Sequence, residues 1–345
     1  MSAICKHLCR IAVLAVSLAL LLGSCGGRTA SYHYTYLDVF DTVTGITVFA
    51  PGQAEADALA ELLHDELLNC HRLFDIYHEY DGLTSLAAVN RLAGEGPVAV
   101  DERILDLLEF SLEMGEASGG KLNVCMGSLL SLWHEARSAG SEHPESAALP
   151  EREKLLSAMA HMSPEALLLD REASTVRFLD PEMKLDVGAV AKGWAVEHAC
   201  RLAKEQGYSG FLISAGGNVC VVGPKGDGSP WKVGLERPDG SGDNLLVLQL
   251  SEGAAVTSGS YQRYYEVDGV RYCHIVDPDS GEPGRAYEMV TVLCPDSAVA
   301  DALSTALFLL PQEEGAALAA AYGAEALWYA GGEVVTTPGF PLPAA

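Results

Sequence analysis

The chain has 345 residues, of which 49% are hydrophobic and 20% are charged, a composition typical of a folded globular protein with one large domain or two ordinary ones. Its 22 Lys and Arg residues are outnumbered by 47 Asp and Glu residues, and the net charge of −25 excludes nucleic acid and anionic lipid headgroups as broadly attracted partners. A phosphate-bearing ligand must therefore be held locally, by backbone amides, a few cations or a bridging metal ion.

The first 24 residues have the pattern of an export signal. Basic residues precede an uncharged run over residues 11–22, which is too short to span a bilayer comfortably as a permanent helix. A Leu-Gly-Ser-Cys sequence then ends at Cys25, and small residues before a cysteine are typical of bacterial lipoproteins, which are cleaved before the cysteine once it carries lipid. We expect residues 1–24 to be removed and residues 25–35 to tether the protein to the cell membrane, outside the cytoplasm. An ordinary signal peptide or an uncleaved anchor is the alternative.

The first half of the chain mixes strand and helix patterns, separated by glycine-rich or polar turns. Its expected elements are a strand over 37–50, helices over 54–72, 102–116 and 150–159, an exposed loop over 136–149, and a hairpin over 167–170 and 175–179.

The second half is richer in short strands. A helix is expected over 187–206, followed by a buried strand over 210–222 that Gly216 and Gly217 interrupt. The remaining expected elements are strands over 231–236, 245–250, 254–258, 261–267, 270–276 and 289–293, helices over 298–310 and 312–322, and a closing hairpin over 326–330 and 333–336. This order predicts an α+β fold, with a mostly antiparallel sheet flanked by helices, as one domain over 36–337 and a tail over 338–345.

Two glycine-rich segments have residues suited to holding an anion. Asp186 precedes a small-residue helix start with Lys192 close by, where free amides and a cation can receive an oxyanion. An ordinary helix cap with a surface lysine gives the same pattern. The glycine pair within residues 214–218 permits close approach of a ligand to the backbone, although such a pair is more often a simple turn.

A potential base and a potential cation site follow. His274 stands at the end of a predicted strand, just before an Asp-Pro turn, where it is either a base or a structural histidine. Asp301 and Thr305 are four residues apart and so share one helix face, where their oxygens either ligate a hard cation or cap the helix start. Taken together, these segments favour phosphate or pyrophosphate chemistry.

Five motifs in this order resemble the bacterial FAD:protein FMN transferase family, the ApbE-like flavin transferases, from about Tyr36 to Tyr329. They are LDVGAVAKGWAV over 185–196, SAGGN over 214–218, TSGSYQRY over 257–264, HIVDP over 274–278 and ADALSTAL over 300–307. The resemblance implies a T-fold-related α+β architecture. It also implies a magnesium-dependent enzyme that splits the pyrophosphate of FAD, joins FMN by a phosphoester bond to a Ser or Thr hydroxyl of an acceptor flavoprotein, and releases AMP.

The resemblance also implies roles for single residues. The implied Mg²⁺ ligands are the main-chain oxygen of Ala189 and the side chains of Asp301 and Thr305, and the implied FAD contacts are Asp186, Lys192, Ile275 and Ser304. His274 matches a histidine needed for transfer, which either activates the acceptor hydroxyl or positions it. A tyrosine of the family corresponds to Tyr77 or to Tyr80.

Two segments depart from the family pattern. A Phe-Asp-Thr sequence begins at Phe40, where many relatives have Met-Gly-Thr, and we expect the flavin contact of that methionine to pass to Phe40. Many relatives also have an aromatic residue after the glycine pair at 119–120. Here Lys121, Leu122 and Asn123 follow instead, and we assign them to flavin binding.

The same residues fit two other functions. If water replaces the acceptor hydroxyl, the protein is a magnesium-dependent FAD pyrophosphatase that yields FMN and AMP. If nothing reacts, it is a flavin-binding surface lipoprotein. The joint presence of cation ligands and His274 disfavours this last function, because binding alone requires neither.

Overall fold

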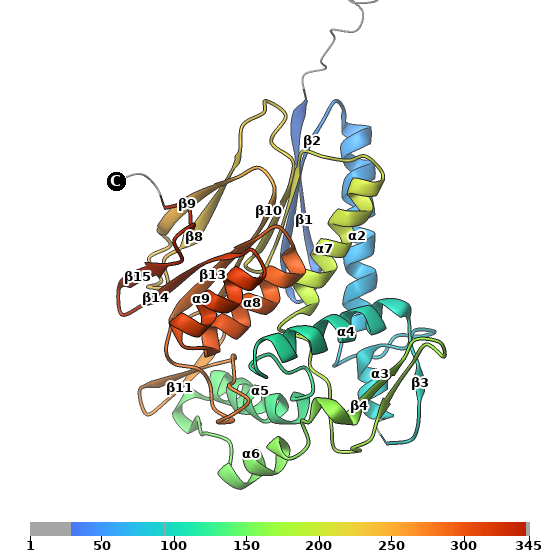
Figure 1. Cartoon of the computed structure of the whole chain (residues 1–345), viewed down its shortest axis with the longest axis vertical. Helices are drawn as coiled ribbons and strands as arrows, with labels where there is room; N and C mark the ends of the chain where they lie inside the picture. Colours follow the sequence, from blue (N-terminus) through green and yellow to red (C-terminus); the bar gives the residue numbers. More distant parts are fainter. Residues whose placement is uncertain (1–28, 93, 343–345) are drawn as a thin grey trace, which may run out of the picture.

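The computed structural model describes residues 29–92 and 94–342, and both the predicted signal and Cys25 lie outside this part of the chain. An eight-stranded antiparallel sheet forms its centre (Figure 1). Its strands, in spatial order, are β1 (Ala30–Val39), β2 (Thr42–Ala50), β6 (Phe211–Ala215), β7 (Asn218–Val222), β10 (Gly253–Gly259), β13 (Met289–Cys294), β14 (Glu325–Ala330) and β15 (Glu333–Thr336).

Four helices lie side by side over one face of this sheet (Figure 1). They are α2 (Gln53–Phe74), α7 (Ala191–Glu205), α8 (Ser297–Leu309) and α9 (Gln312–Ala321). The hairpin of β8 (Trp231–Glu236) and β9 (Asn244–Leu250) covers part of the opposite face. Strand β10 contributes to both layers, since Ala254 and Val256 pack in the main core while Ala255 packs under the hairpin. This alternation follows from the two-residue period of a strand.

The segment between α2 and α7 and the segment between β10 and β13 form the lower part of the molecule in Figure 1. Their elements are α3 (Leu86–Arg91), β3 (Val98–Ala99), α4 (Glu102–Ala117), α5 (Gly127–Glu142), α6 (Arg152–Met159), β4 (Leu167–Asp170), β5 (Thr175–Phe178), β11 (Tyr264–Val267) and β12 (Val270–Cys273). A separate apolar cluster, centred on Trp133 of α5 and Tyr265 of β11, holds α5, α6 and the β11–β12 hairpin together.

The predicted α+β class and antiparallel sheet are confirmed, as are most of the helices and the turn at Gly216 and Gly217, both of which have positive φ. Within the described residues no helix is long and apolar enough to cross a membrane. The cysteines of this part of the chain, which are Cys70, Cys125, Cys200, Cys220, Cys273 and Cys294, are all buried and unpaired.

Folded residues extend beyond both predicted bounds of the domain, and the first predicted strand has a turn within it. The single strand predicted over 37–50 is a hairpin, because Phe40 and Asp41 adopt φ values of 54° and 49° and turn the chain. Strand β1 starts at Ala30, so residues 30–35 belong to the sheet and not to a tether. Its tyrosines bind α2: Tyr34 donates a hydrogen bond to Asp57. At the other end, Phe340 is only 5% exposed under the β8–β9 hairpin, so part of the predicted tail is folded.

Two further predictions within the domain were wrong. Residues 136–142 continue helix α5, where an exposed loop was predicted. Gly140 is buried in this stretch, and a Cβ there would lie 2.7 Å from the ring of Tyr265, so the helix is fixed by tertiary packing. The helix predicted to start at residue 187 starts at Ala191, and residues 187–190 form turns before it.

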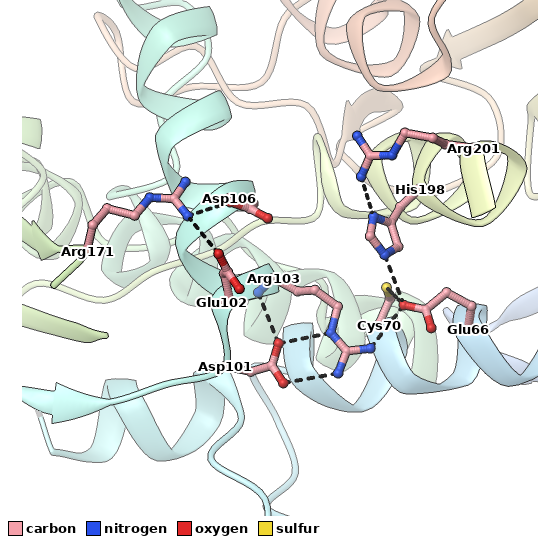
Figure 2. A network of polar contacts seen from close by, with 9 residues as sticks. All are labelled: Glu66, Cys70, Asp101, Glu102, Arg103, Asp106, Arg171, His198 and Arg201. Atoms are coloured by element: carbon pink, nitrogen blue, oxygen red, sulfur yellow. Dashed lines mark hydrogen bonds and ion pairs between the residues drawn. The ribbon is translucent and has the colours of Figure 1, made fainter. Parts of the chain in front are cut away.

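A polar network ties α7 to α2 and α4 (Figure 2). Arg103 at the start of α4 donates to Glu66 of α2 at 3.0 Å and also binds Asp101, the residue that caps α4. His198 of α7 lies 3.3 Å from the same Glu66 carboxylate, and Arg201 donates to His198 Nδ1 at 2.8 Å. Because Nδ1 accepts this hydrogen bond, Nε2 carries the proton that points to Glu66. The network therefore fixes the helix that begins at the candidate site.

Candidate active site

A cleft of about 470 Å³ opens where the β1–β2 turn, the start of α7, the end of β10 and helix α8 meet the lower part of the molecule. This volume falls within the range of about 300–1,000 Å³ that is typical of small-molecule sites. The cleft brings together most of the site residues predicted from the sequence, which are Phe40, Lys121, Leu122, Asn123, Asp186, Ala189, Lys192, His274, Ile275, Asp301 and Thr305.

One hydrogen bond joins the two halves of the predicted cation site. Gly193 of α7 donates its N–H to Oδ2 of Asp301 on α8 at 2.7 Å. Gly193 is the third residue of α7, where an N–H has no partner within the helix, and Ala189, four residues earlier, lies before the helix start. The Ala189 carbonyl accepts no hydrogen bond from any described residue. Ala189 and Asp301 both line the cleft, so the cleft holds a residue with a free main-chain oxygen and a residue with a buried carboxylate.

Burial makes this carboxylate hard to ionise unless a cation is near. Asp301 is 5% exposed, and burial raises its pKa, with Lys192 at 3.9 Å and the Gly193 N–H acting in the opposite direction. Thr305 adds a hydroxyl one helical turn later. The described residues contain no cluster of three or more His, Cys, Asp or Glu side chains that suits a metal. The set of one carboxylate, one hydroxyl and one free carbonyl nevertheless fits a hard divalent cation, which binds oxygen and retains several waters.

His274 is a neutral base in this structure. Its Nδ1 lies 3.3 Å from the carbonyl oxygen of Arg263, and because a carbonyl only accepts, Nδ1 carries the proton and Nε2 keeps a lone pair. Burial, followed by the positive charges of Arg263, Arg137 and Lys192, lowers the pKa of His274 to about 4. The ring is therefore unprotonated at neutral pH and able to accept a proton.

Two arginines of the cleft were not predicted as site residues. Arg263 lies in the TSGSYQRY motif, and no feature of that motif marks its one basic residue as part of the site. Arg137 lies on α5, in the stretch where a loop was predicted, and no local signal marks it. Burial and the neighbouring Arg263 lower the pKa of Arg137, although a guanidinium remains charged at neutral pH. With Lys121 and Lys192, they give the cleft of this acidic protein four basic residues, which face four aspartates of the same lining.

A family model described as the ApbE family matches residues 40–328. The chain belongs to the ApbE family. It is 34% identical over 327 residues to the FAD:protein FMN transferase of Treponema pallidum, with 90% of this chain and 87% of the relative covered. The corresponding protein of Vibrio cholerae is 29% identical over 320 residues, with 90% of each chain covered. The predicted family is confirmed.

Solved structures of ApbE proteins have the same fold. The ApbE protein of Thermotoga maritima is 29% identical, with a TM-score of 0.79 over 90% of this chain and 98% of its own. The flavin transferase ApbE of Vibrio cholerae is 26% identical, with a TM-score of 0.74 over 90% of this chain and 97% of its own. The antiparallel α+β architecture is thus shared across the family.

The residues that depart from the ApbE pattern have structural partners here. Lys121 lies at the cleft, but its ammonium binds Asp277 at 2.8 Å and Asp279 at 2.7 Å, just after His274 in the chain. Leu122 is buried, and the Asn123 amide donates to a main-chain carbonyl of residue 162. Lys121 therefore fastens the glycine-pair segment to the His274 segment, whatever contact it makes with a flavin.

Of four other predicted residues, two line the cleft and two do not. Phe40 lines it and lies edge-on to the ring of His71. Ser304 does not line it, since its buried hydroxyl bonds to the Ser258 hydroxyl at 2.8 Å. Tyr77 lines the cleft and is 59% exposed, whereas Tyr80 points away and donates to Asp75, so Tyr77 is the tyrosine available to a ligand.

Asp186 forms a local turn at the floor of the cleft. Its Oδ1 accepts a hydrogen bond from the Gly188 N–H at 2.8 Å, and burial raises the pKa of its carboxyl. Since α7 begins five residues later, Asp186 does not cap that helix. Its carboxylate is free to contact a polar group of a ligand in the cleft.

Proposed function

We propose that this protein is an FAD:protein FMN transferase that uses Mg²⁺ and transfers FMN from FAD to a Ser or Thr hydroxyl of an acceptor flavoprotein, releasing AMP. The names of its relatives support the reaction class. The observation that carries the proposal is the joint presence, in one cleft, of the free Ala189 carbonyl, the buried Asp301 carboxylate and the neutral His274 ring. A protein that only binds flavin requires none of these.

Ala189, Asp301 and Thr305 would hold the cation, which when bound would neutralise phosphate charge and polarise the pyrophosphate. Lys192 adds a second positive charge beside Asp301. This local charge offsets the repulsion between a chain of net charge −25 and the anionic FAD. Asp186 and the aromatic ring of Tyr77 are placed to contact the uncharged parts of FAD.

The transfer step has one bond formed and one broken. The acceptor hydroxyl oxygen bonds to the phosphorus on the FMN side of FAD, and the bond from that phosphorus to the bridging oxygen breaks, so AMP leaves with that oxygen. The hydroxyl proton passes to Nε2 of His274, whose orientation the Nδ1 hydrogen bond to Arg263 fixes.

We also propose that lipid on Cys25 holds the protein at the outer side of the bacterial cell membrane. The support is the sequence pattern before Cys25 alone, since that residue lies outside the described part of the chain. Metabolic labelling with a radioactive or alkyne-bearing fatty acid tests it, because a Cys25→Ser variant must lose the label while the wild-type protein retains it.

The enzymatic proposal is tested by incubating the mature protein with FAD, Mg²⁺ and exported candidate acceptor domains of the same bacterium, with acceptor mass and released nucleotide as readouts. An acceptor that gains one FMN while AMP appears supports transfer. Asp301→Asn should abolish both products, whereas the matched exposed control Asp239→Asn should not. Free FMN and AMP with every acceptor unmodified would show the pyrophosphatase instead, and intact bound FAD would show a binding protein.

A further inference from the structure

A second, smaller groove lies directly behind the cleft. It has a volume of about 180 Å³, and its lining residues are Trp133, Leu149, Pro150, Arg152, Leu155, Leu156, Met159, Tyr272, Ser280, Glu282 and Arg285. This volume is below the roughly 300 Å³ at which cofactor sites begin, and suits one or two protein side chains. Trp133 lines both the groove and the cleft, so the two spaces share this side chain as a wall.

The chain segment that carries His274 forms a wall of both spaces. His274, Ile275 and Val276 line the cleft, while Tyr272 before them and Ser280, Glu282 and Arg285 after them line the groove. The segment is rigid at this point, because Gly284 donates to the Ile275 carbonyl and Trp133 Nε1 donates to the Gly281 carbonyl at 2.8 Å. The groove and the cleft thus share two walls, Trp133 and the chain segment that carries His274.

Several apolar side chains that line the groove are exposed to solvent. Leu149 is 43% exposed and Leu156 is 54% exposed, and both face the same space as the stacked rings of Trp133 and Tyr272, whose centroids are 6.0 Å apart. Clustered apolar exposure of this kind marks a contact surface more often than an isolated exposed leucine does.

The charged side chains of the groove indicate what kind of partner segment it binds. Arg152 and Arg285 are exposed at the groove, and neither forms an ion pair or a side-chain hydrogen bond with any residue that the structure describes. Arg285 lies 4.6 Å above the ring of Tyr272, which holds its guanidinium over the apolar floor. Glu282 is the one acidic residue in the lining. In a chain of net charge −25, two unpaired cations at one groove complement an acidic group of a partner.

We propose that this groove docks the segment of the acceptor protein that flanks the target Ser or Thr, with an apolar side chain of the acceptor against Leu156 and an acidic side chain between Arg152 and Arg285. Docking here presupposes the transferase activity proposed above, and adds to it how the acceptor is chosen. FAD occupies the cleft and the acceptor reaches it from the groove, so the two substrates are recognised by different surfaces.

The test reverses charge at the groove and leaves the cleft intact. In the full mature chain, the double substitution Arg152→Glu and Arg285→Glu should raise the KM for an unmodified acceptor domain by about tenfold or more, with kcat and the KM for FAD within about twofold of wild type. The control is Arg177→Glu on β5, an exposed arginine outside both spaces, and it should leave all three constants unchanged. An unchanged acceptor KM in the double variant would overturn the proposal.

A second measurement locates the docked segment without depending on charge. A photo-cross-linking benzophenone side chain at position 156 should join the acceptor segment that carries the modified hydroxyl, and the same group at the exposed control position Leu168 should not. Cross-links from 156 to the protein's own N-terminal residues, to a second copy, or to a remote acceptor surface would each overturn the proposal. If the wild-type protein yields only free FMN and AMP, both the proposed transferase activity and the docking proposal fail. If the wild-type protein transfers FMN and the groove variants have an unchanged KM for the acceptor, only the docking proposal fails.

Discussion

The contact between Gly193 and Asp301 makes the cation site sensitive to a single methyl group. A Cβ built on Gly193 would lie 2.3 Å from Asp301 Cβ and 2.5 Å from the Ser297 carbonyl oxygen, whereas ordinary van der Waals contact begins at 3.4 Å. In Gly193→Ala, α7 and α8 must therefore separate by about 1 Å, since both obstacles belong to α8 and one is backbone. The Gly193 hydrogen bond to the Asp301 carboxylate is then lost.

The energetic effect follows from those two changes. Overpacking of a close contact costs about 1–3 kcal/mol, and loss of a hydrogen bond to a charged acceptor costs about 1.5–3 kcal/mol. We expect the free energy of unfolding to fall by about 3 kcal/mol. We also expect the Mg²⁺ concentration for half-maximal transfer to rise at least tenfold, because the Asp301 carboxylate moves relative to the Ala189 carbonyl.

Urea denaturation and a Mg²⁺ titration of activity measure the two effects. The matched control is Gly45→Ala on β2, where an added Cβ has no neighbour within 4 Å. It should change the free energy of unfolding by less than about 1 kcal/mol and leave the Mg²⁺ dependence unaltered. If Gly193→Ala keeps both its stability and its Mg²⁺ half-saturation within the range of this control, close helix contact is not what holds the Asp301 carboxylate in place.

Three other changes probe the groups around the cleft. NMR titration of the His274 ring should give a pKa near 4. Arg263→Gln should raise this pKa toward 6.5, because a positive neighbour disfavours the protonated ring. The acid limb of the pH profile of kcat/KM should then move to higher pH by the same amount. Lys121→Met and Asp277→Asn should each lower kcat, and the double variant should be no worse than Lys121→Met, because that change already removes the ion pair with Asp277. Arg103→Met should lower the free energy of unfolding by about 2 kcal/mol in urea, since the partly buried Glu66 carboxylate loses its arginine partner and keeps His198.

Each of these has a control and a result that contradicts it. Arg271→Gln removes an exposed arginine stacked on Tyr264, and it should not move the His274 titration; a wild-type pKa near 6.5 would contradict the first expectation. Additive losses in kcat would contradict a shared Lys121 bridge. Arg171→Met removes the solvent-exposed arginine drawn beside the network in Figure 2, and it should destabilise the protein less than Arg103→Met does.

Local sequence patterns predicted those parts of the fold and site that depend on near neighbours in the chain. Asp301 and Thr305 were placed on one helix face because four residues make about one turn, and Gly216 with Gly217 marked a strand turn. The Gly193 hydrogen bond to Asp301 joins residues 108 positions apart in the sequence. Helix and strand periodicity cannot predict a contact between residues so far apart.

Tertiary packing also decided where helices and strands begin and end. Ser138, Gly140 and Ser141 are poor helix formers, yet α5 runs through them because Gly140 fits closely against Tyr265. The helix in turn carries Arg137 into the cleft, so the error in secondary structure hid a site residue. Strand β1 was missed at its start because its tyrosines and histidine do not separate into apolar and polar faces by composition alone.

If Cys25 carries lipid as proposed, the early start of β1 sets how far the enzyme can lie from the membrane. Ala30 is already paired in the sheet and is five residues after Cys25, and five residues of chain span at most roughly 17 Å. The catalytic domain would then explore a thin layer next to the bilayer surface instead of a wide volume. Acceptors whose target hydroxyl lies close to the membrane would meet the enzyme often, whereas freely diffusing proteins would seldom enter that layer.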